Sequence, residues 1–174
     1  MSATPTDEFA TLPQGDVRLL HGATAQHLLA SKELARVGYV AADGTPRVFP
    51  MLFHWTGEEL VLSTFHPARK IAALRARPAV AVTIDAAGTP PRALLLRGRA
   101  EVTDVAGVVP DYRLALHRYA GTREAGDAQA DAVDHPGLRM ARIAIRPTWV
   151  GVLDFVTRFP GGSSAAEFDA RGSS

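Results

Sequence analysis

The chain has 174 residues, of which 47% are hydrophobic and 21% are charged, the composition of one globular domain rather than of a disordered chain. It has no cysteine, which excludes thiolate catalysis, cysteine-ligated zinc, iron–sulfur clusters and disulfides. The net charge of +1 does not favour general nucleic-acid binding. No apolar run is long enough to span a membrane, and the N-terminus lacks a signal-peptide pattern. We therefore expect a cytoplasmic protein with neither a nucleic-acid nor a membrane partner.

The first half of the chain predicts an antiparallel β-meander that follows a short helix. Apolar and β-branched runs are closely spaced and are separated by two strong turn signals. Thr24 is the expected N-cap of the helix. The predicted elements are a helix over 25–32, strands over 35–42, 47–55 and 59–64, and turns at Asp43-Gly44 and Thr56-Gly57.

The strand predicted over 47–55 is apolar on both faces. One face carries Arg47, Phe49, Met51, Phe53 and Trp55, and the other carries Val48, Pro50, Leu52 and His54. A barrel interior can cover one face, and the other needs a helix, a second subunit or a flat cofactor. Pro50 has no ladder donor, which predicts a bulge or an unpaired site there.

The second half alternates between helical and strand patterns. Pro67 precedes a helix that Pro78 ends, and a strand expected to be buried on both faces follows over 79–85. Gly98 predicts a bulge or a close backbone approach inside the next strand. The remaining predicted elements are a strand over 92–103, a helix over 109–119, a helix and loop over 121–137, and a last strand or strand pair over 140–145 and 149–155.

About six strands with few, short helices predict a mainly β fold, a closed or nearly closed antiparallel barrel with flanking helices. We expect this domain to occupy residues 17–159. Residues 1–16 are polar and contain proline, and residues 160–174 are rich in glycine and serine. These two segments are predicted to be a flexible arm and a flexible tail.

Conventional catalytic motifs are missing from the sequence. The six histidines lack metal-ligand spacing, and neither a nucleophile elbow nor a Gly-rich phosphate loop is present. We therefore assign no catalytic residue and no metal ligand. If the protein is an enzyme, a bound cofactor must supply the reactive atoms.

The segment from Ser63 to Lys70 is the most informative for binding. A strand ends in two hydroxyls, Ser63 and Thr64, and a short loop leads to a helix that begins with Arg69 and Lys70. Cations at a helix start oppose the macrodipole unless an anion binds there, and free amides at that end attract phosphate. Arg47 lies at the start of a neighbouring strand and is placed to reach the same anion. The alternative is a solvated helix end with flanking charges.

The order of these pieces resembles the pyridoxamine 5′-phosphate oxidase-like flavin and deazaflavin oxidoreductases, which have the FMN-binding split-barrel fold. The resemblance covers residues 24–103 and, more loosely, 139–155. It is carried by the strand GTPRVFP, the strand end ST, the helix start RK and the strand segment GRAE.

The resemblance implies a homodimer with the cofactor at its interface, and hydride transfer to or from a small-molecule substrate. FMN is the implied cofactor, with the deazaflavin coenzyme F-420 as the alternative. Arg75, Arg77 and Arg158 would favour the acidic tail of the deazaflavin. The implied cofactor-binding residues are Arg47, Val48, Phe49, Pro50, Met51, Ser63, Thr64, Arg69 and Lys70.

The resemblance also shows departures. Ala93 stands where true pyridoxamine 5′-phosphate oxidases carry an amide side chain, and their C-terminal substrate-phosphate segment is missing, so oxidation of vitamin B6 is not expected. A non-catalytic protein that binds or stores flavin, or haem through His66, is the alternative function.

Overall fold

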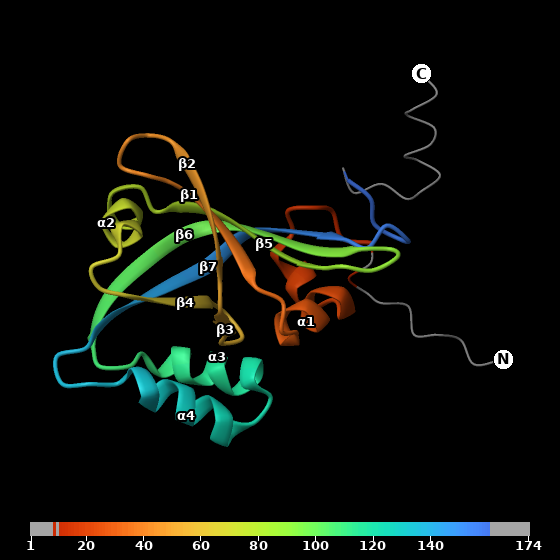
Figure 1. Ribbon diagram of the computed structural model, residues 1–174. Helices are drawn as coiled ribbons and strands as arrows, with labels where there is room; N and C mark the ends of the chain where they lie inside the picture. Colours follow the sequence, from red (N-terminus) through yellow and green to blue (C-terminus); the bar gives the residue numbers. More distant parts are fainter. Residues whose placement is uncertain (1–8, 10, 161–174) are drawn as a thin grey trace.

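The structure is a computed structural model that describes residue 9 and residues 11–160. The predicted arm and tail lie largely outside the described residues. The elements in chain order (Figure 1) are η1 (Val17–His21), α1 (Ala23–Ala30), β1 (Ala35–Val40), β2 (Pro46–Met51), β3 (Phe53–Trp55), β4 (Leu60–Phe65), α2 (Arg69–Ala76), β5 (Ala79–Ala86), β6 (Arg92–Ala106), α3 (Pro110–Ala120), α4 (Arg123–Val133) and β7 (Arg139–Leu153).

The seven strands form one antiparallel sheet in the order β2-β1-β5-β6-β7-β4-β3. Its two outermost strands, β2 and β3, are consecutive in the chain and are separated only by Leu52. One short run of chain therefore reaches both ends of the sheet, so the sheet must curl round into a barrel. This confirms the prediction of a mainly β fold with flanking helices.

The prediction of one strand over 47–55 is wrong, because the chain changes its pairing partner in the middle. β2 pairs with β1, whereas β3 pairs with β4. The break falls at Leu52 and not at Pro50, which stays in register opposite Arg36. A strand that serves two ends of a curled sheet has to interrupt its ladder where it passes from one partner to the other.

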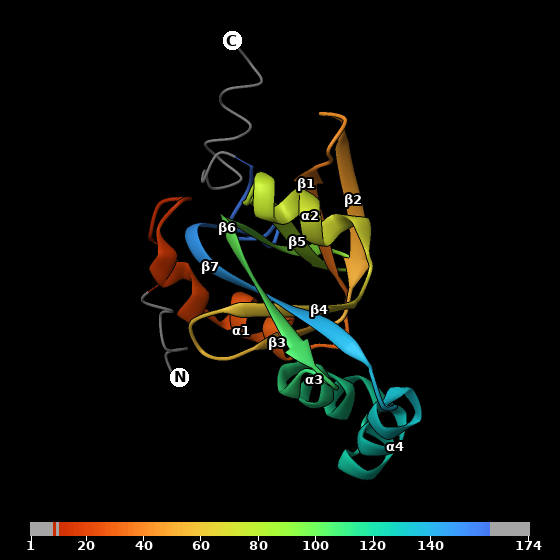
Figure 2. The same ribbon diagram turned by 90° about the vertical axis from the view of Figure 1, so that its left-hand side faces the viewer.

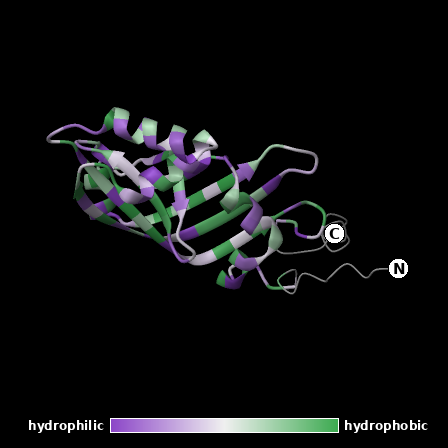
Figure 3. Ribbon diagram, turned by 90° about the horizontal axis from the view of Figure 1, so that it is seen from below, coloured by the Kyte–Doolittle hydropathy of each residue, from purple (hydrophilic) through white to green (hydrophobic). Residues whose placement is uncertain are grey.

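Hydrophobic residues of the strands fill the barrel interior, and in β1 and β5 buried positions alternate with more exposed ones. Figure 3 shows hydrophobic and hydrophilic residues interspersed along the strands. Phe53, Leu62, Leu96 and Ile143 are at most 1% exposed. The prediction that β5 is buried on both faces is wrong, since its residues alternate between exposed and buried. Small alanines on its outer face gave the sequence its continuous apolar appearance.

β6 and β7 are the two longest strands, and their pairing shifts register between Arg97 and Gly98. The pairing passes over Thr148, so the bulge lies on β7 opposite Gly98 and not inside β6, whereas the close backbone approach predicted at Gly98 is confirmed. A Cβ atom on Gly98 would lie 2.6 Å from the carbonyl oxygen of Arg146 and 3.1 Å from Ile145 Cγ2. The glycine is therefore required by the close approach of the β7 backbone.

One helix prediction is wrong and another is confirmed. Gly22, and not Thr24, is the N-cap of α1, although Leu28 and Leu29 face inward as expected. The segment predicted as a helix and loop contains the regular helix α4, whose N-cap Thr122 accepts a hydrogen bond from the Ala125 amide at 3.1 Å. α4 packs against α3, and Figure 1 shows this pair at one end of the barrel. Among the described residues, no helix has the length and apolar composition to cross a bilayer.

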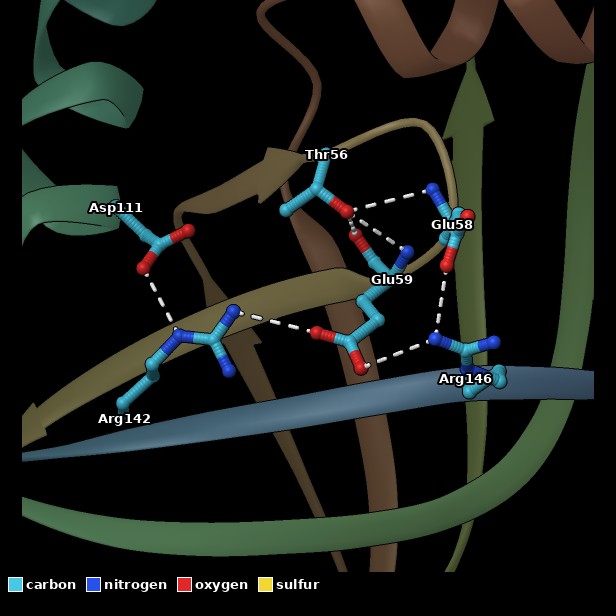
Figure 4. A network of polar contacts seen from close by, with 6 residues as sticks. All are labelled: Thr56, Glu58, Glu59, Asp111, Arg142 and Arg146. Atoms are coloured by element: carbon cyan, nitrogen blue, oxygen red, sulfur yellow. Dashed lines mark hydrogen bonds and ion pairs between the residues drawn. The ribbon is translucent and has the colours of Figure 1, made fainter.

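A network of ion pairs fixes this end of the barrel (Figure 4). Arg142 of β7 donates from Nε to Asp111 at 2.9 Å and from Nη2 to Glu59 at 3.3 Å, and Arg146 pairs with Glu58 at 2.8 Å. Asp111 lies in the first turn of α3, where the helix dipole favours a carboxylate. The network joins α3 and the β3–β4 turn to β7, so it supports the short strand β3.

The bulge yields a stability prediction. Replacing Gly98→Ala should lower the free energy of unfolding by about 1–3 kcal/mol, because the added methyl group meets backbone that cannot move aside. Gly38→Ala is the matched control, since its Cβ would make an ordinary 3.6 Å contact and its change should stay within about 1 kcal/mol. Denaturant unfolding measures both, and equal effects would contradict the assignment of Gly98 as a residue required opposite the bulge.

Candidate functional site

A surface cleft of about 370 Å³ lies between the β1–β2 hairpin and α2. Figure 2 shows α2 lying beside these two strands on the outside of the barrel. The cleft brings together residues from β1, the hairpin turn, β2 and α2. Its lining residues are Tyr39, Ala41, Ala42, Asp43, Arg47, Phe49, Arg69 and Ala73.

The cationic side of the cleft is formed by Arg47 and Arg69, which are far apart in sequence. Arg47 Nη2 donates to Asp43 Oδ2 at 3.0 Å, and its Nη1 donates to the hydroxyl of Thr45. Hydrogen bonds from Thr45, together with the charge of Arg47, hold the pKa of the Asp43 carboxyl below its ordinary value. Arg47 is thus positioned at the rim of the cleft by the hairpin turn.

The start of α2 offers further anion-binding groups. Its N-cap, Ala68, provides no side-chain cap, and the backbone amides of Arg69 and Lys70 have no acceptor among the described residues. Among the described residues, neither the Arg69 nor the Lys70 side chain forms an ion pair with a carboxylate. Two free amides and two unpaired cations at one helix start are a suitable arrangement for a phosphate group.

Aromatic rings form the apolar side of the cleft. Tyr39 and Phe49 stack with their ring centroids 6.0 Å apart and an interplanar angle of 19°. Lys70 Nζ lies 4.8 Å from the centroid of the Phe49 ring. Burial lowers the pKa of Lys70, so the approach of an anion would stabilise its charged form. The site therefore joins a flat apolar surface to a cationic one.

The remaining predicted site residues lie outside this cleft lining. Val48 and Pro50 belong to the opposite face of β2, whereas Met51 packs against the barrel core. Ser63 and Thr64 lie on β4 opposite Arg142 and Ala141, and Thr64 is only 8% exposed. The cleft thus contains Arg47, Phe49 and Arg69, with Lys70 beside it, and does not contain the two hydroxyls.

Sequence reasoning missed Tyr39 and Asp43 as parts of this cleft. The sequence pattern predicts Asp43 only as a turn residue and Tyr39 only as a strand residue. Strand alternation places Tyr39 on one face of β1 but does not show what covers that face. The register of Tyr39 opposite Arg47 was the missing information.

The surplus arginines considered for an acidic cofactor tail are already engaged. Arg75 donates to Asp104 at 2.7 Å, and Arg77 donates to the backbone oxygen of Ala41 at 3.0 Å. Arg158 is 7% exposed and donates to the backbone oxygen of Leu12 at 2.6 Å. His66, considered as a haem ligand, lies 2.8 Å from Asp104 through Nε2.

Comparison with known proteins defines the class of protein. A family model described as "Pyridoxamine 5'-phosphate oxidase" matches residues 22–146. The chain therefore belongs to the pyridoxamine 5′-phosphate oxidase family. A search of the curated proteins gave no match.

Three solved structures are similar to this chain. An F420 reductase is 28% identical with a TM-score of 0.53, over 72% of this chain and 94% of that protein. The conserved hypothetical protein Rv2991 from Mycobacterium tuberculosis is 19% identical with a TM-score of 0.57, over 73% and 80%. A heme binding protein from Mycobacterium smegmatis is 16% identical with a TM-score of 0.54, over 88% and 56%. The last two similarities show the fold alone.

The cleft yields a binding prediction. The double replacement of Arg69→Ala and Lys70→Ala should weaken FMN or coenzyme F-420 binding by about tenfold or more, since charge-assisted hydrogen bonds to phosphate contribute about 1.5–3 kcal/mol each. Isothermal titration or fluorescence quenching measures the affinity. The double replacement of Lys32→Ala and Arg92→Ala removes the same charge at exposed positions outside the cleft and should have little effect. Unchanged affinity in the first variant would remove the clamp assignment.

Proposed function

We propose that this protein is an oxidoreductase that binds a phosphate-bearing flavin-type cofactor, FMN or coenzyme F-420, and transfers hydride between that cofactor and a small-molecule substrate. The observation that carries the proposal is the cleft in which Arg47, Arg69 and Lys70 meet the stacked rings of Tyr39 and Phe49. Family membership supports it independently.

The chain's own residues have two tasks in this function. Arg69, Lys70 and the two free amides of α2 hold the cofactor phosphate. Phe49 and the β2 backbone provide a surface along which the ring system lies. The bound cofactor supplies the hydride chemistry, so the protein provides binding, orientation and exclusion of water. No side chain needs to act as a nucleophile.

Two observations bear on the choice of cofactor. The F420 reductase is 28% identical to this chain, a similarity that extends beyond the fold, and this supports coenzyme F-420. The three arginines considered for the acidic tail are engaged within the chain, which removes that argument for it. The phosphate clamp suits both cofactors equally, so experiment must distinguish FMN from coenzyme F-420.

A second copy of the chain is part of the proposal. β2 is exposed over almost its whole length, and Val48 and Phe49 are 66% and 40% exposed. A strand of this apolar composition is covered in most soluble proteins. We propose that a homodimer buries β2 and completes the cofactor site with residues of the second copy.

The cofactor assignment has a direct test. The purified protein is titrated separately with FMN, coenzyme F-420 and haem while the absorption spectrum of each ligand is followed. We expect saturable binding of FMN or F-420, together with reduction or oxidation of the bound cofactor when candidate substrates are added. A protein that binds none of the three would overturn the proposed function, and one that binds only haem would replace it.

The dimer has a test of its own. Val48→Glu should convert the protein to a monomer in sedimentation velocity, because it places a charge in the proposed interface, and it should weaken cofactor binding at the same time. Val156→Glu is the matched control, since Val156 is 63% exposed and lies outside the sheet. A wild-type protein that sediments as a monomer at micromolar concentration would refute the dimer.

A further inference from the structure

The carboxylate of Asp104, on β6, contacts side chains from three other parts of the chain. These are His66 in the loop between β4 and α2, Arg75 in the last turn of α2, and Arg139 at the start of β7. Loop, helix and two long strands thus meet at one acidic group, which lies outside the cleft.

The geometry at Asp104 is specific. Its Oδ1 lies 2.8 Å from His66 Nε2 and 2.7 Å from Arg75 Nη2, and its Oδ2 lies 3.7 Å from Arg139 Nη2. The hydrogen bond from Arg75 and then that from His66 lower the pKa of Asp104, so the carboxyl is ionised at neutral pH and only accepts. His66 must therefore carry its proton on Nε2.

These contacts act on α2 from both of its ends. His66 lies in the loop by which the chain enters the helix, and Arg75 lies in its last turn. Arg69 and Lys70 lie between these two attachments. α2 has only eight residues and buries one face through Ile71, Ala73 and Leu74. A hydrophobic face permits small rotations of so short a helix, whereas two hydrogen bonds to one oxygen restrict them.

We propose that Asp104 is a positioning residue for the anion site at the start of α2, and that it holds Arg69, Lys70 and their free amides in the orientation that receives the cofactor phosphate. The proposal rests on the proposed function. In this proposal, Asp104, His66 and Arg75 affect cofactor affinity without contacting the cofactor.

The proposal predicts a change in phosphate affinity that is opposite in sign to the change expected from charge alone. A carboxylate near an anion site repels the anion, so through-space charge alone predicts that neutralising Asp104 strengthens phosphate binding. Loss of positioning predicts the opposite, because the clamp would then sample orientations that do not bind. The two effects change the same affinity in opposite directions.

The experiment compares the wild-type protein with Asp104→Asn, which keeps the shape of the side chain and removes its charge. Asp85→Asn is the matched control, because Asp85 forms an exposed ion pair with Arg36 between β5 and β1. Affinities are measured for FMN and for riboflavin, which has the same ring and no phosphate. If the cofactor is F-420, that coenzyme and its phosphate-free deazaflavin chromophore take their places.

We expect Asp104→Asn to bind the phosphate-bearing ligand about five- to tenfold more weakly, with the affinity for the phosphate-free ligand unchanged. Asp85→Asn should alter neither affinity. Equal or tighter binding of the phosphate-bearing ligand by Asp104→Asn would overturn the proposal, and so would an equal loss for both ligands. A wild-type protein that binds no ligand of either pair would instead overturn the proposed function.

A general loss of folding would also weaken binding. Thermal unfolding therefore shows whether Asp104→Asn is folded at the temperature of the binding measurement. Arg75→Gln removes the charged donor at the far end of α2, and the double variant with Asp104→Asn should bind no more weakly than Asp104→Asn alone, because both changes weaken the same charge-assisted contact. Additive losses would show that the two residues act separately and would overturn the proposal.

Discussion

The constraint on which the rest of the structure depends is the exchange of partners at Leu52. The strand before this residue forms one end of the sheet and the strand after it forms the other end. Backbone hydrogen bonding to β1 and then to β4 forces the sheet to close. The odd-numbered residues of this run consequently pass from the external cleft at Arg47 and Phe49 to the barrel interior at Phe53.

The closure also places the charged groups. β2 leaves the barrel as the outer strand of a hairpin, and α2 packs beside it, so the start of α2 faces the side chains of β2. Elsewhere on the surface most arginines in the described part of the chain pair with carboxylates or backbone oxygens. Among the described residues, neither Arg69 nor Lys70 forms an ion pair with a carboxylate. Asp104 instead contacts His66, in the loop before α2, and Arg75, in the last turn of α2. The cations at the start of α2 are left available to an external anion.

Much of the fold could be predicted from sequence because the determining signals are local. Turn residues such as Asp43-Gly44, the prolines around α2 and the internal Gly98 each restrict the backbone by their own chemistry. The partner exchange at Leu52 could not be predicted, because an apolar strand gives no sign of which neighbour it pairs with. The same limit explains why β5 was expected to be covered on both faces: alanine is compatible with burial and with exposure alike.

The composition of the candidate cleft could be predicted in part for the same reason. Arg69 and Lys70 could be predicted as anion-binding residues because a helix start is a local feature with a known preference for anions. The place of Tyr39 in the cleft depends on strand register, and the role of Asp104 depends on contacts between β6, β7, α2 and the β4–α2 loop, none of which leaves a pattern in the sequence. Ser63 and Thr64 show the reverse case: their hydroxyls suggested a binding role, but the strand places them away from the cleft lining.

We propose that the start of α2 holds the phosphate of a flavin-type cofactor, and a crystal structure of the protein with its bound cofactor tests this most directly. We expect phosphate oxygens within hydrogen-bond distance of the Arg69 and Lys70 amides and side chains, with the ring system lying along β2. A cofactor phosphate bound elsewhere, with the start of α2 in contact only with solvent, would contradict this proposal.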